Sequence, residues 1–131
     1  IGDHVIFAPQ VYLLAHDTST KKSTGYVRIG KIKIGDNCFI GARVFIMPGV
    51  SLGENCIVGA ASVVTKSFPK NSVIAGNPAK LICSVEEYEK RIKKQLENSP
   101  KFSKEYHLDA ISEIKKQEMR DALNDNFGYI Q

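Results

Sequence analysis

Residues 34–65 read IGDNCFIGARVFIMPGVSLGENCIVGAASVVT, and an aliphatic side chain returns in this stretch at every sixth position. The aliphatic positions are Ile34, Ile40, Ile46, Leu52, Val58 and Val64. A second column at the same period holds mostly small or β-branched residues, namely Cys38, Val44, Val50, Cys56 and Ser62. Side chains return to the same face about every 3.6 residues in an α-helix and about every two residues in a strand. Neither element alone therefore explains a six-residue spacing.

The period predicts a short strand of about five residues followed by a corner, repeated along the chain. Three such units close one coil of eighteen residues, and residues eighteen apart then stack at about 4.8 Å. Stretches that begin at Ile1, Ile34 and Leu52 align without gaps, and the last two are eighteen residues apart. The aliphatic residues point inward, while Gly, Asn and Asp relieve the backbone at the corners. The sequence therefore predicts a mainly β fold, a parallel β-helix of hexapeptide repeats.

An insertion interrupts the repeats near the start of the chain. The first two aligned stretches are thirty-three residues apart, which is fifteen more than one coil. The excess predicts a polar loop at about residues 15–33 that begins beside His16, and long loops in compact domains are often functional. His16 aligns with Gly49 and Ser67, so one interpretation is a solvent-facing corner residue. The other is a general base, because imidazole titrates near neutral pH.

Composition and charge narrow the classes of protein. The 131 residues, 43% hydrophobic and 24% charged, suit one compact globular domain with an appended element. Residues 1–83 carry nine basic and four acidic side chains, which favours an anionic partner such as an anionic lipid or a phosphorylated small molecule. The sequence contains no basic helix with interleaved aromatic residues, which is the pattern typical of nucleic acid binding. No apolar run approaches the roughly 20 residues that span a bilayer.

The cysteines and histidines also bear on the class. Three cysteines without a CxxC pair favour a reducing compartment, and hence a cytoplasmic protein. Cys38 and Cys56 should be vertical neighbours; a disulfide is conceivable there, and two buried thiols are the favoured interpretation. Three scattered histidines argue against a zinc site, and His4 is interpreted as a turn residue. The absence of a serine or cysteine nucleophile motif disfavours a covalent enzyme intermediate.

A column of small residues marks a possible binding surface. Eighteen-residue stacking places Gly41 by Gly59 and Ala42 by Ala60, with Ala8 in the coil before. Corners need small residues in any case, which is one explanation of the column. The other is a smooth groove in which a slender ligand lies along the backbone amides.

The segment VVTKSFPKNSVIAGNPAK, residues 63–80, is more specific than the repeat. With it, residues 1 to about 83 resemble the hexapeptide-repeat acyltransferases, and in particular the galactoside, maltose and polysaccharide O-acetyltransferase branch. The resemblance implies a left-handed parallel β-helix, acetyl-CoA as co-substrate without a metal, and a homotrimer with active sites between neighbouring subunits. It also implies a general base at His16, with Asp17 as the adjacent acid that orients the imidazole or contacts the sugar. For Asp17 a turn-capping role is the alternative.

The resemblance further implies a set of residues that contact the acyl-CoA: Ala42, Ala60, Thr65, Lys66 and Lys80. Ala42 stands where a serine is frequent, so a hydroxyl contact is lost there while a backbone N–H contact remains. Lys66 and Lys80 are expected to meet phosphates of the nucleotide end as point charges.

These features lead to one function and two alternatives. The chain is expected to transfer an acetyl group from acetyl-CoA to a hydroxyl of a sugar or saccharide, with His16 as general base. The alternatives are an N-acetyltransferase of an amino sugar and a non-catalytic β-helix that serves as a scaffold subunit.

Residues 84–131 are predicted to form a helical C-terminal extension. A first helix over 84–97 has a capping box of Ser84 and Glu87, and Asn98-Ser99-Pro100 ends it. A second helix over 108–126 has Asp109 as its predicted N-cap. The residues expected on its buried face are Ile111, Ile114, Met119 and Leu123.

Overall fold

A computed structural model of the protein describes residues 1–107, 109, 111–124 and 127–131. The chain divides into two compact units, Ile1–Tyr88 and Glu89–Gln131. The first unit holds the repeats and the second holds the C-terminal segments. The division falls inside the helix α2 (Val85–Glu97), which begins in the first unit.

Two-residue strands recur along the repeats every six residues. They are β5 (Lys33–Ile34), β6 (Phe39–Ile40), β7 (Phe45–Ile46), β8 (Ser51–Leu52), β9 (Ile57–Val58) and β10 (Val63–Val64). The coil before them contributes β1 (Ile6–Phe7) and β2 (Tyr12–Leu13). The predicted alternation of strand and corner is confirmed, but each ladder, at two residues, is shorter than expected. The ladders are short because a sharp bend turns the backbone away soon after each pair of residues.

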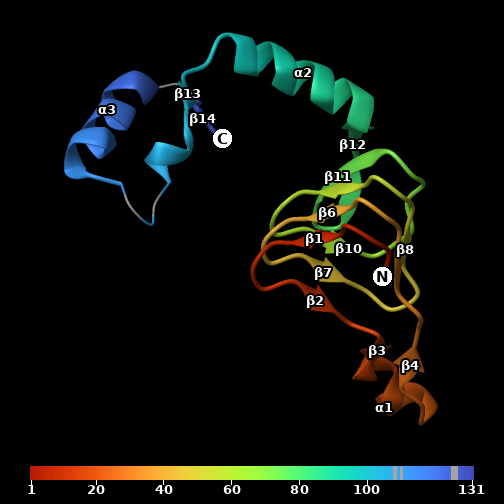
Figure 1. The fold of residues 1–131 in the computed structure, drawn as a ribbon. Helices are drawn as coiled ribbons and strands as arrows, with labels where there is room; N and C mark the ends of the chain where they lie inside the picture. Colours follow the sequence, from red (N-terminus) through yellow and green to blue (C-terminus); the bar gives the residue numbers. More distant parts are fainter. Residues whose placement is uncertain (108, 110, 125–126) are drawn as a thin grey trace. The chain divides into compact units, whose positions relative to one another are not determined.

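Strands of successive coils pair in parallel and form three flat faces (Figure 1). The first face contains β1, β6, β9 and β11 (Ser72–Gly76), the second β2, β7 and β10, and the third β5 and β8. Phe39 pairs with Ile57 and Phe45 with Val63, so the stacked residues are eighteen apart, as predicted. The bends after the first, second and third faces are called the first, second and third corners.

The core lies inside the coils and contains both predicted columns. The six aliphatic residues from Ile34 to Val64 are 0–3% exposed, and the column from Cys38 to Ser62 is 0–2% exposed. The Ser62 hydroxyl is also buried, but it donates to the Gly59 carbonyl oxygen at 2.6 Å and accepts from the Gly76 N–H at 3.0 Å. Burial of apolar side chains between stacked coils is thus the main stabilising contribution in this unit.

The corners need two different backbone properties. Positive φ angles of 55–87° recur every sixth residue, at Asn37, Arg43, Gly49, Asn55 and Ala61. His4, with a φ of 54°, occupies the equivalent place in the first coil, so its interpretation as a turn residue is confirmed. The glycines that follow the strands serve a different purpose from the one predicted. A Cβ on Gly41 would lie 2.6 Å from the Ala60 nitrogen, so glycine is required there by the close approach of the next coil.

The two ends of the coil differ. At the C-terminal end, β11 pairs antiparallel with β12 (Ala79–Ser84), and the turn between them contains a cis Asn77–Pro78 bond. At the other end, Ile1, Phe7 and Leu13 occupy positions of the inner column but are 74%, 39% and 39% exposed. They line an open apolar hollow of about 310 Å³ together with Ala8 and Val11.

The two stacked cysteines are buried free thiols, as favoured by the sequence. The Cys56 N–H donates to the Cys38 sulfur at 3.4 Å, which shows that the two residues are vertical neighbours. Burial raises the pKa of the Cys56 thiol.

The second unit contains more than helices. The capping box at the start of α2 is confirmed: the Ser84 N–H donates to Glu87 Oε2 and the Glu87 N–H to Ser84 Oγ, both at 3.1 Å. A parallel pair of strands, β13 (Lys101–Phe102) and β14 (Tyr129–Ile130), was not predicted. A 3₁₀ turn, η2 (Lys104–Tyr106), follows β13.

The predicted second helix needs correction. The helix α3 (Glu113–Leu123) begins after Ser112, whose hydroxyl accepts the Lys115 N–H at 3.3 Å, so Ser112 and not Asp109 is the N-cap. Ile114 is 73% exposed and does not belong to a buried face. Positions 108, 110, 125 and 126 of the predicted helix lie outside the described residues. No helix in the described part of the chain is long and apolar enough to cross a membrane.

Candidate active site

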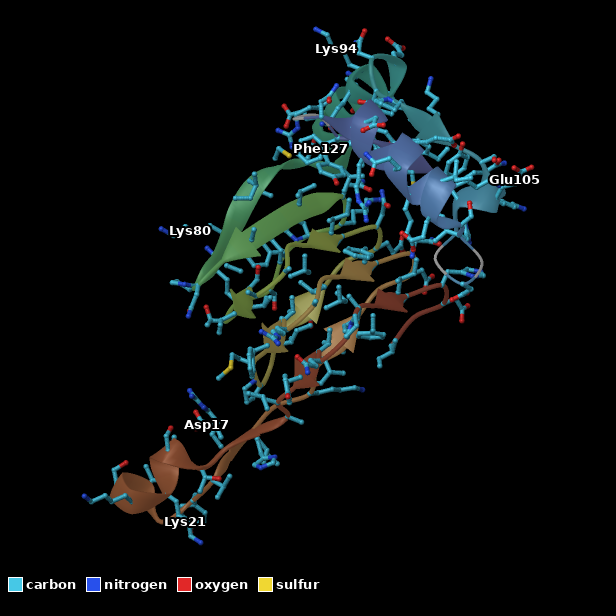
Figure 2. The ribbon with its side chains drawn as sticks, turned by 90° about the vertical axis from the view of Figure 1, so that its left-hand side faces the viewer. Asp17, Lys21, Lys80, Lys94, Glu105 and Phe127 are labelled. Carbon is cyan, nitrogen blue, oxygen red and sulfur yellow. The ribbon has the colours of Figure 1, made fainter. Side chains whose placement is uncertain are left out.

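The inserted segment is an ordered hairpin and not an open loop. It leaves the coil at Ala15 and returns at Gly30, whose N–H donates to the Ala15 carbonyl oxygen at 2.9 Å. The antiparallel strands are β3 (His16–Asp17) and β4 (Arg28–Ile29). A 3₁₀ turn, η1 (Thr18–Thr20), and a short helix, α1 (Lys21–Thr24), join them. Figures 1 and 2 show this inserted hairpin projecting away from the stacked coils.

His16 lies at the base of the inserted hairpin with its side chain exposed. It follows β2 at the second corner, where its backbone begins β3, whereas the equivalent Gly49 has a positive φ of 87°. The Gly30 N–H donates to the Ala15 carbonyl oxygen, so the next pair along the ladder, His16 and Ile29, is a non-hydrogen-bonded pair. In such a pair the two Cα atoms, and hence the two side chains, lie closer together than in a hydrogen-bonded pair. The His16 ring makes no hydrogen bond to any described residue, which leaves both ring nitrogens accessible to a substrate.

Asp17 is engaged within the hairpin. Its Oδ1 accepts the Ser19 N–H at 2.9 Å, which caps η1, and its Oδ2 is 2.5 Å from Arg28 Nη2. The hydrogen bonds from Ser19 and then from Arg28 lower the pKa of the Asp17 carboxyl to about 2. Successive residues of a strand point to opposite sides, so this carboxylate lies on the side away from the His16 ring. The arrangement matches the turn-capping alternative for Asp17.

The small-residue column forms the first corner of the coils, as predicted. Backbone hydrogen bonds of 2.8–2.9 Å from Ala8, Gly41 and Gly59 join each residue to the next coil. Ala42 is half-buried and Ala60 is exposed, and neither N–H donates to a backbone carbonyl among the described residues. The first corner therefore presents an edge of two columns of small residues with amide donors available to a ligand, bordered by Arg43, whose Nε donates to Gln10 Oε1 at 2.8 Å.

Lys80 lies beside this edge. It pairs across the β11–β12 hairpin with Ala75, and the Gly59 N–H donates to the Ile74 carbonyl oxygen one residue earlier. The side chain is exposed, and Figure 2 shows it at the outer edge of β12. A cation is thus available close to the edge formed by Ala42 and Ala60.

Thr65 and Lys66 lie at the second corner, at the other end of the second face. Backbone hydrogen bonds of 2.9 and 3.0 Å join Leu14 to β7 and Met47 to β10, so the residues after these strands stack. Thr65 and Lys66 follow β10 and are therefore at the same corner as His16, two coils away, or roughly 10 Å along the stack.

The predicted site residues thus form two groups. His16, Thr65 and Lys66 share the second corner, whereas Ala42, Ala60 and Lys80 share the first. Between them runs the outer surface of the second face, where the Tyr12 and Phe45 rings stack with centroids 4.8 Å apart. A single chain does not bring the two groups together.

Sequence reasoning missed two residues of the inserted hairpin. Arg28 contacts Asp17, and the Thr20 hydroxyl accepts the Arg28 N–H at 3.1 Å and donates to the Tyr26 carbonyl oxygen at 2.8 Å. Their contacts depend on which residues of β3 and β4 lie opposite each other, and the hexapeptide repeat does not predict that pairing. No cluster of three or more His, Cys, Asp or Glu side chains that suits a metal ion occurs among the described residues.

Comparison with known proteins supports the repeat assignment. A family profile described as the hexapeptide repeat of succinyl-transferase matches residues 31–66. Protein CapG of Staphylococcus aureus is 46% identical over 103 residues, which are 76% of this chain and 58% of CapG. The chain spans about half the length of the curated relatives it matches, between 45% and 58% for three of them.

Two solved structures share the fold. A maltose O-acetyltransferase from Clostridium difficile has a TM-score of 0.59 at 40% identity, and the match covers 64% of this chain and 46% of that one. A galactoside acetyltransferase in complex with coenzyme A has a TM-score of 0.60 at 38% identity, with 68% and 46% covered. The repeat match, the sequence relative and these two structures show that the chain contains hexapeptide repeats and is similar to the hexapeptide-repeat acetyltransferases.

Proposed function

We propose that this chain transfers an acetyl group from acetyl-CoA to a hydroxyl of a sugar or saccharide, within a left-handed β-helix. The observation that carries the proposal is the placement of His16. It is an exposed imidazole without an intramolecular partner among the described residues, and it stands at the base of an ordered hairpin on the corner that also holds Thr65 and Lys66. Imidazole titrates near neutral pH, which suits a general base for deprotonation of a hydroxyl.

The chemistry requires no covalent enzyme intermediate. Acetyl-CoA, when bound, supplies the acetyl group as an activated thioester. His16 accepts the hydroxyl proton as the acceptor oxygen bonds to the acyl carbon, and it returns that proton to the sulfur as the carbon–sulfur bond breaks. The free amides of Ala42 and Ala60 are suited to stabilise the negative charge that develops on the carbonyl oxygen.

The residues of the two corners fit an acyl-CoA. The edge formed by Gly41, Ala42 and Ala60 leaves room for a slender pantetheine arm, because none of these three residues carries a side chain larger than a methyl group. Lys80 beside that edge and Lys66 at the second corner supply cations for phosphate groups. Lys66 Nζ lies 5.5 Å from the centre of the Phe68 ring, which restrains its position without neutralising its charge.

A homotrimer completes the proposal. The two groups of site residues lie at opposite ends of one face, so the first corner of one copy has to meet the second corner of its neighbour to form a whole site. The exposed aromatic stack of Tyr12 and Phe45 between the corners supports such packing, because large apolar side chains are enriched at interfaces. The three free thiols support a reducing, cytoplasmic location.

Calorimetry with acetyl-CoA and an acceptor panel tests this function. The panel contains neutral sugars and the corresponding amino sugars, and turnover is followed by release of the free CoA thiol. We expect acetyl-CoA binding and thiol release with the neutral sugars. Turnover with amino sugars alone would identify an N-acetyltransferase, and the absence of CoA binding would identify a scaffold.

His16→Gln is the decisive variant because it removes the base while it retains a polar side chain of similar size. We expect turnover to fall by about 10²–10⁴-fold and the affinity for acetyl-CoA to remain unchanged. Wild-type turnover in this variant would refute the assignment of the base.

A further inference from the structure

The inserted hairpin is ordered without an apolar core. None of its segments, β3, η1, α1 or β4, contains a buried residue. Its apolar side chains point to solvent, with Tyr26 at 79% and Ile29 at 80% exposure. Hydrogen bonds and one ion pair must therefore define its shape, and with it the direction of the His16 side chain.

Arg28 is the residue on which these polar contacts converge. Its guanidinium contacts Asp17 Oδ2, and its backbone N–H donates to Thr20 Oγ1 at 3.1 Å. Thr20 in turn donates to the carbonyl oxygen of Tyr26, so both arms and the tip of the hairpin are connected. Asp17 contributes from the opposite arm and also caps η1 through Ser19.

His16 lies between two cross-strand links. On one side the Gly30 N–H donates to the Ala15 carbonyl oxygen at 2.9 Å, and on the other Arg28 contacts the Asp17 side chain. We propose that Arg28 is a positioning residue for His16, because its ion pair with Asp17 clamps the strand that carries the base. This inference rests on the proposed function of His16 and assigns Asp17 to the same clamp, without contact to the substrate.

The clamp is expected to act on geometry more than on overall stability. The side chains of Arg28 and Asp17 are 62% and 18% exposed, and ion pairs near the surface contribute little to global unfolding. Catalysis is more sensitive, because misplacement of a reacting group by about 1 Å can lower the rate by roughly 100-fold. The Asp17 carboxylate and the Arg28 guanidinium are both charged at neutral pH, so the pair persists under assay conditions.

Four variants and a control separate this role from others. Arg28→Gln removes the guanidinium, Arg28→Lys retains a charge, and Asp17→Asn removes the carboxylate charge but keeps an oxygen for the Ser19 N–H. The fourth variant combines Arg28→Gln with Asp17→Asn. Lys22→Gln is the matched control, since it removes an exposed cation from the same hairpin.

Steady-state kinetics and amide hydrogen exchange are measured on each variant. We expect Arg28→Gln to lower kcat by about 10–100-fold with an unchanged KM for acetyl-CoA, and to speed exchange at the Gly30 amide. Arg28→Lys should recover part of the loss. The double variant should be no worse than either single one, because both substitutions break the same contact.

Several results would overturn the inference. One is a kcat within twofold of wild type for Arg28→Gln while His16→Gln is inactive, and another is an equal loss in Lys22→Gln. If His16→Gln keeps full turnover, the proposed base is wrong, and hydrogen exchange alone then decides whether Arg28 holds this strand. In that case an unchanged rate at the Gly30 amide refutes the clamp.

Discussion

The strongest quantitative test of the stacked core is a pair of truncations in one column. Ile46 is 0% exposed and pairs with Leu13 in the coil before and with Val64 in the coil after. Ile46→Ala removes three carbon groups at about 0.8 kcal/mol each, or about 2.4 kcal/mol in all. The coils on both sides restrict collapse around the cavity, so the total loss is expected to reach about 3–4 kcal/mol.

Leu13→Ala is the matched control because it removes the same number of carbon atoms from the same column. Leu13 is 39% exposed at the open end of the coil, so part of its side chain already contacts water in the folded state. The expected loss is about 1–1.5 kcal/mol. The difference between the two variants therefore measures the contribution of a coil on each side.

Equilibrium unfolding in urea, followed by far-ultraviolet circular dichroism, provides the assay. All proteins are compared at one concentration, because association of copies would add a concentration-dependent term to the free energy of unfolding. Comparison also requires equal denaturant slopes, which indicate that the same surface is exposed. A loss below about 1 kcal/mol for Ile46→Ala, or equal losses for both variants, would refute the stacked core as the main source of stability.

Three further predictions concern Lys80 beside the first corner, Gly41 at that corner and Asp17 in the inserted hairpin. Lys80→Gln should weaken acetyl-CoA binding in calorimetry by roughly 3–10-fold at low salt and less at high salt, since a single charge is lost. An equal effect of Lys70→Gln, from another corner, would contradict that assignment. Gly41→Ala should lower the free energy of unfolding by about 1–3 kcal/mol in urea titrations, because the added Cβ would lie 2.6 Å from the Ala60 nitrogen; wild-type stability would contradict it. The pKa of Asp17 falls from 3.8 to about 2 on folding, so its contribution to hairpin order is complete above about pH 4 and is lost as the pH falls through 2. A carboxyl titration by NMR with a midpoint near 4 would contradict both the hydrogen bond from Ser19 and the pairing with Arg28.

The repeats were predictable because their information is local and occurs many times. Each inward position, from Ile34 to Val64, recurs at the same interval, so an error at one repeat is corrected by the others. The stacking of Cys38 and Cys56 follows from the same interval and is confirmed. The small-residue column was also predictable, although its glycines are required by close packing between coils and not by positive φ.

Features that occur once in the chain were harder to predict. The contact between Asp17 and Arg28 joins residues on two arms of the hairpin, and the sequence does not state the register of those arms. Ser112 and Asp109 are both residue types that favour the N-cap position, so residue type alone does not select between them. The pairing of β13 with β14 joins two short segments that are distant in sequence and share no repeat.

The closing hydrogen bond between Gly30 and Ala15 has a consequence for evolution. The chain leaves the coil and returns to it at adjacent points, so the ladder above and below is the same as if no residues had been inserted. Inserted segments of other lengths and sequences can therefore be exchanged at this point without a change in the register of the coils. Because the proposed base His16 and the Asp17–Arg28 pair lie at the root of the insertion, and the proposed acyl-CoA contacts lie outside it, the segment 18–27 can diversify while both are retained.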